Sequence, residues 1–266
     1  MNEGKVITIL PVLSLSRREL VRFYRQKSRI IGSLGTPVVL WALLGSGLQA
    51  AFPGAAGSAD SSSYLKYFFP GSLVLTILFT SIFTNISVIE DRNEGFLQGV
   101  LVAPVSRLGL VLGKVLGGAM IATIQGLFFL ALAPLAGFSM SFLEIVQLVA
   151  AILATSLCLT TVGFIFAWKL DSVQGFHSVM NLFLMPMWLL SGAFFPATRA
   201  PLLLRTVIYL NPLTYGFSAI QNALQGATSP SLFVTFNMSL MVECVFVVLF
   251  GLIAIWVVSE RKDRSI

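Results

Sequence analysis

The sequence predicts an all-α, polytopic membrane protein with six transmembrane helices, an N-terminal amphipathic interfacial helix and an external re-entrant helical hairpin before the last span. Composition is the first reason. Of 266 residues, 56% are hydrophobic and 11% are charged, and the mean hydropathy is +0.90, whereas soluble domains carry about 25% charged residues. The second reason is a series of apolar windows long enough to cross a bilayer. The third is the distribution of the basic residues, which gather on alternate sides of these windows.

Residues 1–29 are expected to form a cytoplasmic segment that contains the interfacial helix. The apolar run that follows is too long for a signal-peptide h-region, so we expect the segment to stay on the protein. Basic and apolar side chains recur on different faces of this helix, as in helices that lie in the headgroup layer. They are Arg18, Arg22, Arg25 and Arg29 on one face and Leu13, Leu20, Tyr24 and Ile31 on another. A basic cluster that only fixes the topology is the alternative interpretation.

The predicted transmembrane domain covers residues 30–258, and a short cytoplasmic tail follows at 259–266. Six windows within the domain have the length of about 20 residues that a spanning helix needs. They are 30–51, 67–89, 108–138, 142–168, 177–195 and 232–258. The third window is longer than a span requires and contains Pro134, so it should tilt or break near its outer end. Pro186 should kink the fifth.

The basic residues predict the orientation. When the segments between the windows alternate across the membrane, 14 Lys and Arg residues lie on the side of both termini and three lie on the other side. Cytoplasmic loops carry an excess of Lys and Arg. We therefore expect a multi-pass protein of the cytoplasmic (inner) membrane, embedded in the lipid bilayer, with both termini in the cytoplasm. The net charge of +6 then reflects topology and does not indicate binding to nucleic acid.

Enzyme and metal-site signatures are absent from the sequence. It has one histidine and no His-Glu-x-x-His or Gly-x-Ser-x-Gly motif, so we predict no catalytic residue and no metal ligand. The run from Gly109 to Lys114 has three residues between its glycines, which does not fit a Walker A loop. Gly109, Gly113 and Gly117 instead predict close approach of a neighbouring helix. Lys114 is expected to reach the headgroups with its long side chain, and both cysteines are expected to be packing residues.

A short helix is predicted in the loop after the second window, over residues 90–104. Acidic residues are expected in or before its first turn, where negative charge complements the helix dipole. An apolar face with i, i+3, i+4 spacing follows, and a proline ends the helix. In this order the residues are Glu90, Asp91, Glu94, Leu97, Val100, Leu101 and Pro104. A helix with such a face either lies on the membrane or inserts into a groove of a partner.

The segment from 189 to 224 is apolar but repeatedly interrupted, by Pro196, Pro201, Asn211, Pro212 and Gly216. None of its apolar runs reaches the length of about 20 residues that a span needs. We expect a helical hairpin at about 196–228 that enters the outer leaflet from the external side. An ordinary external loop is the alternative, but it would expose many Leu, Phe and Tyr side chains to water.

Four polar residues lie within the predicted spans. Glu243 is about 16 Å along its helix, where a charge costs roughly 2.5–3.5 kcal/mol, so it should face protein or water. Two roles are open: hydrogen bonding to the segment 211–221, which we favour, and contact with cargo on an exit path. Asn85, Gln125 and Asn181 are candidate pocket residues, although interhelical hydrogen bonds would explain them at least as well.

These features together resemble the membrane subunit of an ABC-2 type transporter. The resemblance rests on the order and spacing of the basic helix, the six windows, EDRNEGFLQGVLVAPVSRLGLVLGK after the second window, and SGAFFPATRAP followed by NPLTYGFSAIQNAL before the sixth. It implies that this chain and a second copy of it assemble with two copies of a separate ATP-binding cassette subunit. That subunit would bind ATP and Mg²⁺, so this chain is expected to hold no cofactor and to be no enzyme. ATP hydrolysis would drive export of a substrate.

The resemblance also assigns residues. Those expected to form the coupling helix, which rests in a groove of the ATPase, are Glu90, Asp91, Arg92, Glu94, Gly95, Phe96, Leu97, Val100, Leu101 and Pro104. Those expected in the re-entrant hairpin are Pro196, Pro201, Asn211, Pro212 and Tyr215. The alternatives are an ATPase-independent secondary transporter or channel, and a membrane scaffold subunit. The substrate, and whether the second permease is identical, stay open.

Overall fold

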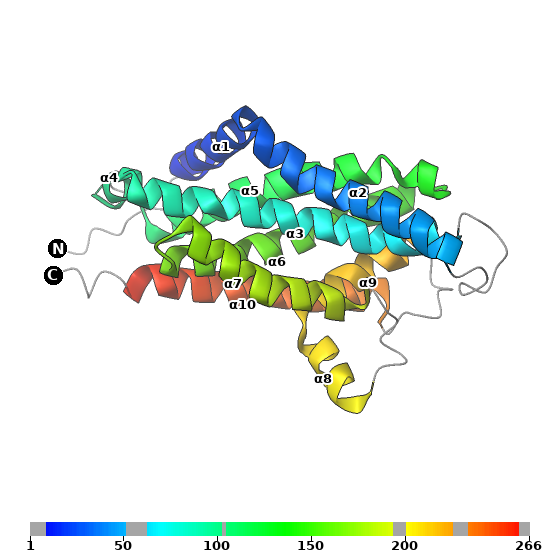
Figure 1. Ribbon diagram of the computed structural model, residues 1–266. Helices are drawn as coiled ribbons and strands as arrows, with labels where there is room; N and C mark the ends of the chain where they lie inside the picture. The colour runs from blue at the N-terminus through cyan, green and yellow to red at the C-terminus, as the bar shows by residue number, and fades with distance from the viewer. Residues whose placement is uncertain (1–8, 52–62, 103–104, 194–200, 226–233, 261–266) are drawn as a thin grey trace.

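The computed structural model describes residues 9–51, 63–102, 105–193, 201–225 and 234–260. Within these ranges the chain is helical and contains no strand, which confirms the predicted fold class. The long helices lie side by side along one direction, while α1 and α4 lie at one end and α8 projects from one side (Figure 1).

The described residues form a series of helices. In chain order they are α1 (Ile9–Arg25), α2 (Lys27–Ala51), α3 (Ser63–Asn93), α4 (Phe96–Val102), α5 (Arg107–Leu130), the 3₁₀ turn η1 (Ala133–Ala136), α6 (Phe142–Lys169), α7 (Val173–Trp188), the π-helical turn η2 (Leu189–Ala193), α8 (Leu202–Leu210), α9 (Pro212–Gln225) and α10 (Phe236–Glu260).

The central helix of the bundle is α3. Helices α2, α5, α6 and α7 all pack on it, and its apolar side chains, such as Phe69, Leu73 and Ile77, are buried. Its buried polar residues are mostly small hydroxyls. Ser72 and Thr76, for example, each donate to the carbonyl four residues earlier in the same helix. These bonds satisfy the hydroxyls without a partner from another helix.

Among the described residues, five helices, α2, α3, α5, α6 and α10, are long and apolar enough to cross a membrane. The predicted fifth span differs, because α7 has only 16 residues, about 24 Å, against a hydrocarbon core of about 30 Å. Pro186, which lacks a backbone N–H, lies near its end. The π-helical turn η2 follows and contains Gly192 with a φ of 95°, a backbone conformation that favours glycine. The six predicted spans are therefore five full-length helices and one short, interrupted one.

Local sequence signals set several helix ends. Ser106, Ser141 and Ser172 cap the N-termini of α5, α6 and α7, each accepting a backbone N–H with its hydroxyl oxygen. The predicted break near Pro134 is confirmed, since α5 stops before it and Pro134 lies in η1.

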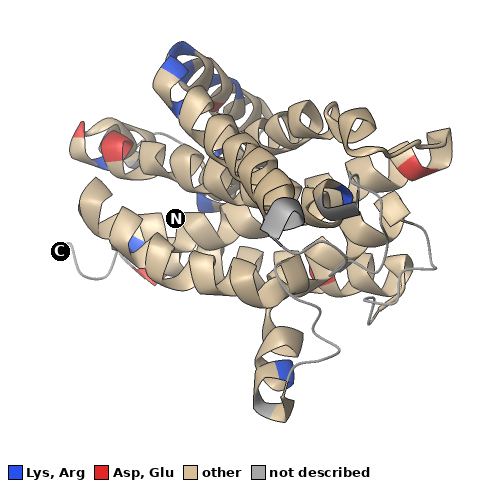
Figure 2. Cartoon of the chain, turned by 45° about the vertical axis from the view of Figure 1, so that its right-hand side comes forward, with Lys and Arg blue, Asp and Glu red and all other residues tan. Residues whose placement is uncertain are grey.

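One end of the bundle collects α1, α4, the start of α5 and the ends of α3, α6 and α10 (Figure 1). We call it the α4 end. Two arginines link helices there by donating to carbonyls near helix C-termini. Arg92 of α3 donates to Trp168 of α6, and Arg107 of α5 donates to Ser259 of α10, each over 2.7 Å. Figure 2 shows that charged residues gather at this end, whereas the middle of the bundle carries few.

Helix α1 packs against the glycine row of α5, which consists of Gly109, Gly113 and Gly117. A Cβ added at Gly113 would lie 2.8 Å from the Cβ of Leu15, and one added at Gly117 would lie 3.0 Å from the Cα of Ser16. The Ser16 hydroxyl also donates to the Gly113 carbonyl over 2.9 Å. The predicted close contact is confirmed at Gly113 and Gly117, where a Cβ would crowd α1. At Gly109 the nearest α1 atom would lie 3.9 Å from an added Cβ, an ordinary contact distance.

The outer edge of the bundle is formed partly by α10, which exposes Val245, Val248 and Leu252. Such a face suits contact with lipid acyl chains. Cys158 is buried in α6 and Cys244 is exposed on α10, and both are free thiols. The expectation of a packing residue is confirmed for Cys158, whereas Cys244 is not packed inside the described bundle.

Candidate functional site

A buried charge cluster joins four helices at the α4 end. Helical spacing of i and i+4 places its two α1 arginines on the same side of the helix, where they reach α3. The charge cluster consists of Arg18, Glu19 and Arg22 of α1, Arg29 of α2, Glu90 and Asp91 of α3, and Lys114 of α5.

Asp91 is at the centre of the charge cluster and is completely buried. Its carboxylate accepts two hydrogen bonds from the Arg18 guanidinium, over 2.6 and 2.7 Å, and one from Arg22. Lys114 pairs with the same carboxylate. The hydrogen bond to Asp91 raises the pKa of Arg18 above its ordinary value. Charge-assisted and bidentate bonds of this kind fix the relative position of α1 and α3.

Lys114 also pairs with Glu19 of α1, and both residues are buried. The Lys114 Nζ lies 2.6 Å from Oε1 of Glu19, while Oε2 accepts the Ser87 hydroxyl over 2.6 Å. The expectation that Lys114 reaches the headgroups is wrong, because α1 covers this part of α5 and supplies a carboxylate to it. A pattern within one helix cannot reveal a partner that lies 95 residues away.

Glu90 of α3 forms ion pairs with both α1 and α2. Its carboxylate accepts from Arg22 over 2.9 Å and from Arg29 over 2.5 Å. The predicted range of the short helix, 90–104, begins too early: Glu90 and Asp91 precede α4 but lie near the C-terminus of α3, where the helix dipole disfavours negative charge. The arginines of α1 and α2 compensate for this. Glu94, just beyond α3, is mostly exposed and lies 3.6 Å from Arg22.

A tight turn separates α4 from α3. Gly95 in this turn has a φ of 77°, a conformation that favours glycine. The helix itself is shorter than the predicted range 90–104, and Pro104 and the side chain of Leu101 lie outside the described residues. The Arg18 guanidinium lies 3.8 Å from the ring centroid of Phe96, a cation–π contact. The charge cluster therefore positions α4 as well as α1 and α3.

The predicted apolar face of α4 is used within this chain. Leu97 is 1% exposed and belongs to the bundle core, and Val100 packs against that core. The expectation that Leu97 is presented to a partner is wrong, because α4 lies on the bundle with this face inward. The exposed residues are Gln98, Gly99 and Val102, of which Val102 is 88% exposed. The sequence alone does not single out these three residues, since their exposure depends on how α4 packs.

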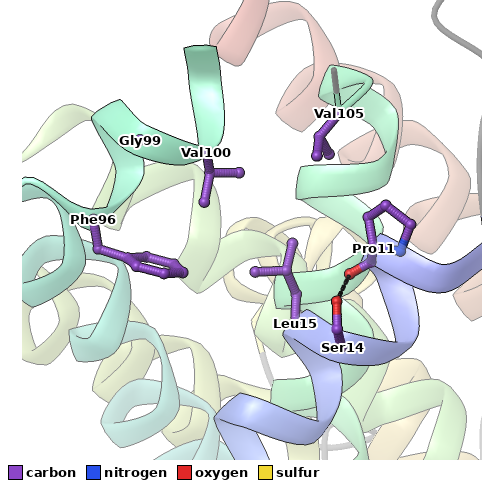
Figure 3. Close-up of a pocket in the computed structure, with 7 residues that line it drawn as sticks. All are labelled: Pro11, Ser14, Leu15, Phe96, Gly99, Val100 and Val105. Atoms are coloured by element: carbon purple, nitrogen blue, oxygen red, sulfur yellow. Dashed lines mark hydrogen bonds between the residues drawn. The ribbon is translucent and has the colours of Figure 1, made fainter. Parts of the chain in front are cut away.

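An apolar hollow of about 370 Å³ lies between α1, α4 and the start of α5 (Figure 3). In Figure 3, Phe96 and Val100 of α4 approach Leu15 of α1 across it. The hollow is lined by Pro11, Ser14, Leu15, Phe96, Gly99, Val100 and Val105. It offers apolar contacts directly beside the exposed edge of α4.

The segment before the last span forms two helices, as the predicted hairpin requires, but in different surroundings. Helix α9 is buried and packs against α6 and α10, whereas α8 projects from the side of the bundle (Figure 1). Asn211 fixes the junction: its Nδ2 donates to the Met187 carbonyl over 2.6 Å, and its Oδ1 accepts the backbone N–H two residues on over 3.0 Å. Pro212 begins α9, where a missing N–H costs nothing.

Of the other predicted hairpin residues, Pro201 and Tyr215 lie in the described part of the chain. Pro201 directly precedes α8 and is exposed, while Pro196 lies outside the described residues. Tyr215 on α9 donates its hydroxyl to the Tyr209 carbonyl of α8 over 2.9 Å. This bond joins the two helices of the hairpin.

The uncharged polar residues of the predicted spans do not come together. Asn85 of α3 is buried, and its Nδ2 donates to the Thr160 carbonyl of α6 over 3.1 Å, the interhelical bond that its structural interpretation predicts. Gln125 is buried in α5, and its amide has no hydrogen-bond partner among the described residues. Asn181 is exposed on α7, so it does not share a buried pocket with the other two.

Glu243 lies where α10 meets α6 and α9, and it is buried. A Cβ added at Gly216 of α9 would lie 2.6 Å from its Oε1 and 2.6 Å from the Thr155 hydroxyl oxygen of α6. Its Oε2 has no hydrogen-bond partner in the described part of the chain. The carboxyl thus lies against Gly216 of the segment 211–221, and the hydrogen bond to that segment stays a prediction. The cargo role stays a hypothesis.

Comparison with known families identifies the class of protein. The sequence model described as ABC-2 type transporter matches residues 11–224, which include the charge cluster, α4 and both hairpin helices. The chain belongs to the ABC-2 type transporter family. It is the membrane permease of an ABC transporter, and such permeases are normally non-enzymatic subunits that associate with an ATP-binding subunit.

Several named relatives resemble the permease. It is 26% identical over 209 residues to a Cyanophora paradoxa protein named as transport permease ycf38, a match covering 78% of the permease and 71% of that protein. Nodulation protein J of Rhizobium leguminosarum bv. viciae is 24% identical over 199 residues, or 74% and 75% of the two chains. The Escherichia coli K12 protein named as multidrug ABC transporter permease YbhR is 29% identical over 164 residues, 56% of the permease and 41% of YbhR.

Proposed function

We propose that this permease exports a substrate, driven by ATP hydrolysis in a separate ATP-binding cassette subunit that docks at α4. The observation that carries the proposal is the exposed edge of α4, formed by Gln98, Gly99 and Val102, on a helix whose other face is fixed in the bundle. An apolar side chain that is 88% exposed, as Val102 is, suits a groove in a partner. The hollow beside α4 offers further apolar contact surface.

The charge cluster would transmit movement from α4 to the membrane helices. Arg18 contacts Phe96 of α4 and Asp91 of α3 at the same time. A displacement of α4 would act on Arg18 through Phe96. Because the buried ion pair between Arg18 and Asp91 is costly to break, α1 and α3 would then move together. Helix α3 is buried along most of its length, so its movement would reach α5, α6 and α7.

The proposed assembly contains two copies of this permease and two copies of the ATP-binding subunit, which binds ATP and Mg²⁺. We place it in the cytoplasmic (inner) membrane with the α4 end and both termini in the cytoplasm. The uneven distribution of 14 against three basic residues supports this orientation. An ATPase that draws on cytoplasmic ATP must bind on that side.

The test compares Val102→Asp with Leu135→Asp. Leu135 is an exposed apolar residue in η1, which follows the opposite end of α5, and serves as the matched control. Each tagged variant is purified from its native host, and copurified ATPase and ATP hydrolysis are measured. We expect Val102→Asp to reduce both at least about tenfold, because a buried, unpaired charge would oppose docking. Membrane insertion should stay normal. A Val102→Asp complex that retains its ATPase and its ATP hydrolysis would refute docking at this edge.

A further inference from the structure

The basic residues near the N-terminus divide into two groups with different surroundings. Arg18 and Arg22 face the bundle and bind the carboxylates of α3. Arg17, Arg25 and Lys27 are exposed, and none of them forms an ion pair with a carboxylate of the described residues. The outward group therefore carries positive charge that this part of the protein leaves uncompensated.

The cations that face the bundle, to which Arg29 of α2 and Lys114 of α5 also belong, are by contrast balanced by carboxylates. Four cations meet four carboxylates within ion-pair distance. The cations are Arg18, Arg22, Arg29 and Lys114, and the carboxylates are Glu19, Glu90, Asp91 and Glu94. Any anion attracted to α1 from outside the chain would accordingly be attracted by the outward group.

Arg17 lies in the middle of an exposed apolar face. At about 100° per residue, Glu19 projects to the opposite side of the helix from Arg17, and Glu19 is buried against α5. The positions one and two turns from Arg17 share its face. They are occupied by large side chains that are all exposed: Leu10, Leu13, Val21 and Tyr24.

A guanidinium surrounded by exposed apolar side chains fits the boundary between headgroups and acyl chains. Apolar side chains of an interfacial helix enter that boundary, and its cations meet the phosphates. Arg suits a phosphate better than Lys does, because its planar fork donates two parallel hydrogen bonds. Further exposed cations at the end of α1 and the start of α2 favour an anionic lipid over a zwitterionic one.

We propose that Arg17 is the centre of a binding site for an anionic phospholipid on the outward face of α1, with Arg25 and Lys27 supplying the charge that selects it. The acyl chains lie against Leu13 and Val21. The site is independent of the direction of transport and of the ATP-binding subunit, so it can fail while the proposed function holds.

The test uses the purified full-length permease and native mass spectrometry. Phosphatidylglycerol and phosphatidylcholine with identical acyl chains are titrated against the wild type, Arg17→Gln, Arg17→Lys and Lys169→Gln. Lys169 is an exposed cation at the end of α6 and controls for net charge. We expect the wild type to prefer phosphatidylglycerol. Arg17→Gln should weaken that binding about fivefold, the loss expected for one cation at a membrane surface, Arg17→Lys should weaken it less, and Lys169→Gln should leave it unchanged.

Thermal unfolding of each variant accompanies the titration. Because Arg17 forms no ion pair in the described chain, Arg17→Gln should keep the wild-type Tm, and weaker lipid binding then reports the site itself. Equal binding of the two lipids by the wild type would overturn the proposal. So would an equal loss in Arg17→Gln and Lys169→Gln, which would show an effect of net charge alone. Unchanged lipid binding by Arg17→Gln with reduced recovery of the ATPase would show that this face binds protein, and would overturn the proposal too.

Discussion

Lys114 of α5 and Glu19 of α1 form an ion pair inside the α4 end, with Nζ 2.6 Å from Oε1 and side chains only 2% and 4% exposed. Lys114 also pairs with Asp91 of α3, so one ammonium group links three helices. The glycine row of α5 makes this geometry possible, because it lets α1 approach closely enough for Glu19 to reach Lys114.

Removing the ammonium should destabilise the permease. Lys114→Met leaves Glu19 buried without its cation, and breaking one side of a buried ion pair costs about 3–5 kcal/mol. We expect a clear decrease in the Tm of the purified permease in detergent, measured by the loss of its monodisperse peak after heating.

The double variant Glu19→Gln with Lys114→Met separates charge from packing. It removes both charges, while the glutamine can still accept the Ser87 hydroxyl, so much of the lost stability should return. Lys169→Met changes an exposed cation and should leave the Tm unchanged. A wild-type Tm for Lys114→Met would mean that the pair contributes little to the fold.

A methyl group at the α1–α5 contact should also destabilise the fold. In Gly113→Ala the new Cβ would lie 2.8 Å from the Cβ of Leu15, which forces the helices apart at a cost of about 1–3 kcal/mol. Gly251→Ala on α10 is the matched control, because a Cβ there meets no atom within 4 Å. Its Tm should equal or exceed that of the wild type, since alanine favours helix over glycine. Equal Tm values for the two variants would argue against tight packing along the row.

The orientation can be tested by cysteine labelling. In a background with Cys158→Ala and Cys244→Ala, single cysteines replace Ser139, in the connection between η1 and α6, and Asn93, at the α4 end. Both positions are exposed. An impermeant maleimide should label the cysteine at 139 in intact cells and the cysteine at 93 only after lysis, because the basic α4 end is expected in the cytoplasm. The reverse pattern would invert the proposed topology.

Glu243 is expected to hold α9 in place. Glu243→Gln keeps the size and hydrogen-bonding capacity of the side chain, so the Tm, the recovery of the ATPase and ATP hydrolysis should stay near wild type. Glu243→Leu should lower the Tm, because it loses an interhelical polar contact worth about 1 kcal/mol and places branched carbons against Gly216. Normal assembly of Glu243→Gln together with lost transport would favour contact with cargo. Full stability and activity of the leucine variant would exclude both roles.

Features that depend on neighbouring residues were predictable from the sequence alone. Hydropathy located five of the six spans as full-length helices, because a bilayer requires a continuous apolar run. Pro134 predicted the break after α5, and the spacing of Gly113 and Gly117 predicted a close helix contact. The order of the motifs was enough to suggest the family, which comparison then confirmed.

Only the tertiary structure decided which residues meet and which face outward. Glu90 and Asp91 look like the start of a loop helix, yet they end α3, because arginines of α1 and α2 stabilise negative charge there. Leu97 has the spacing of a docking anchor but points into the bundle, which leaves Val102 exposed. Lys114 has no carboxylate within a helical turn and finds Glu19 95 residues earlier in the chain. Helical periodicity reports which residues share a face, whereas the partner of that face is set by packing between segments far apart in sequence.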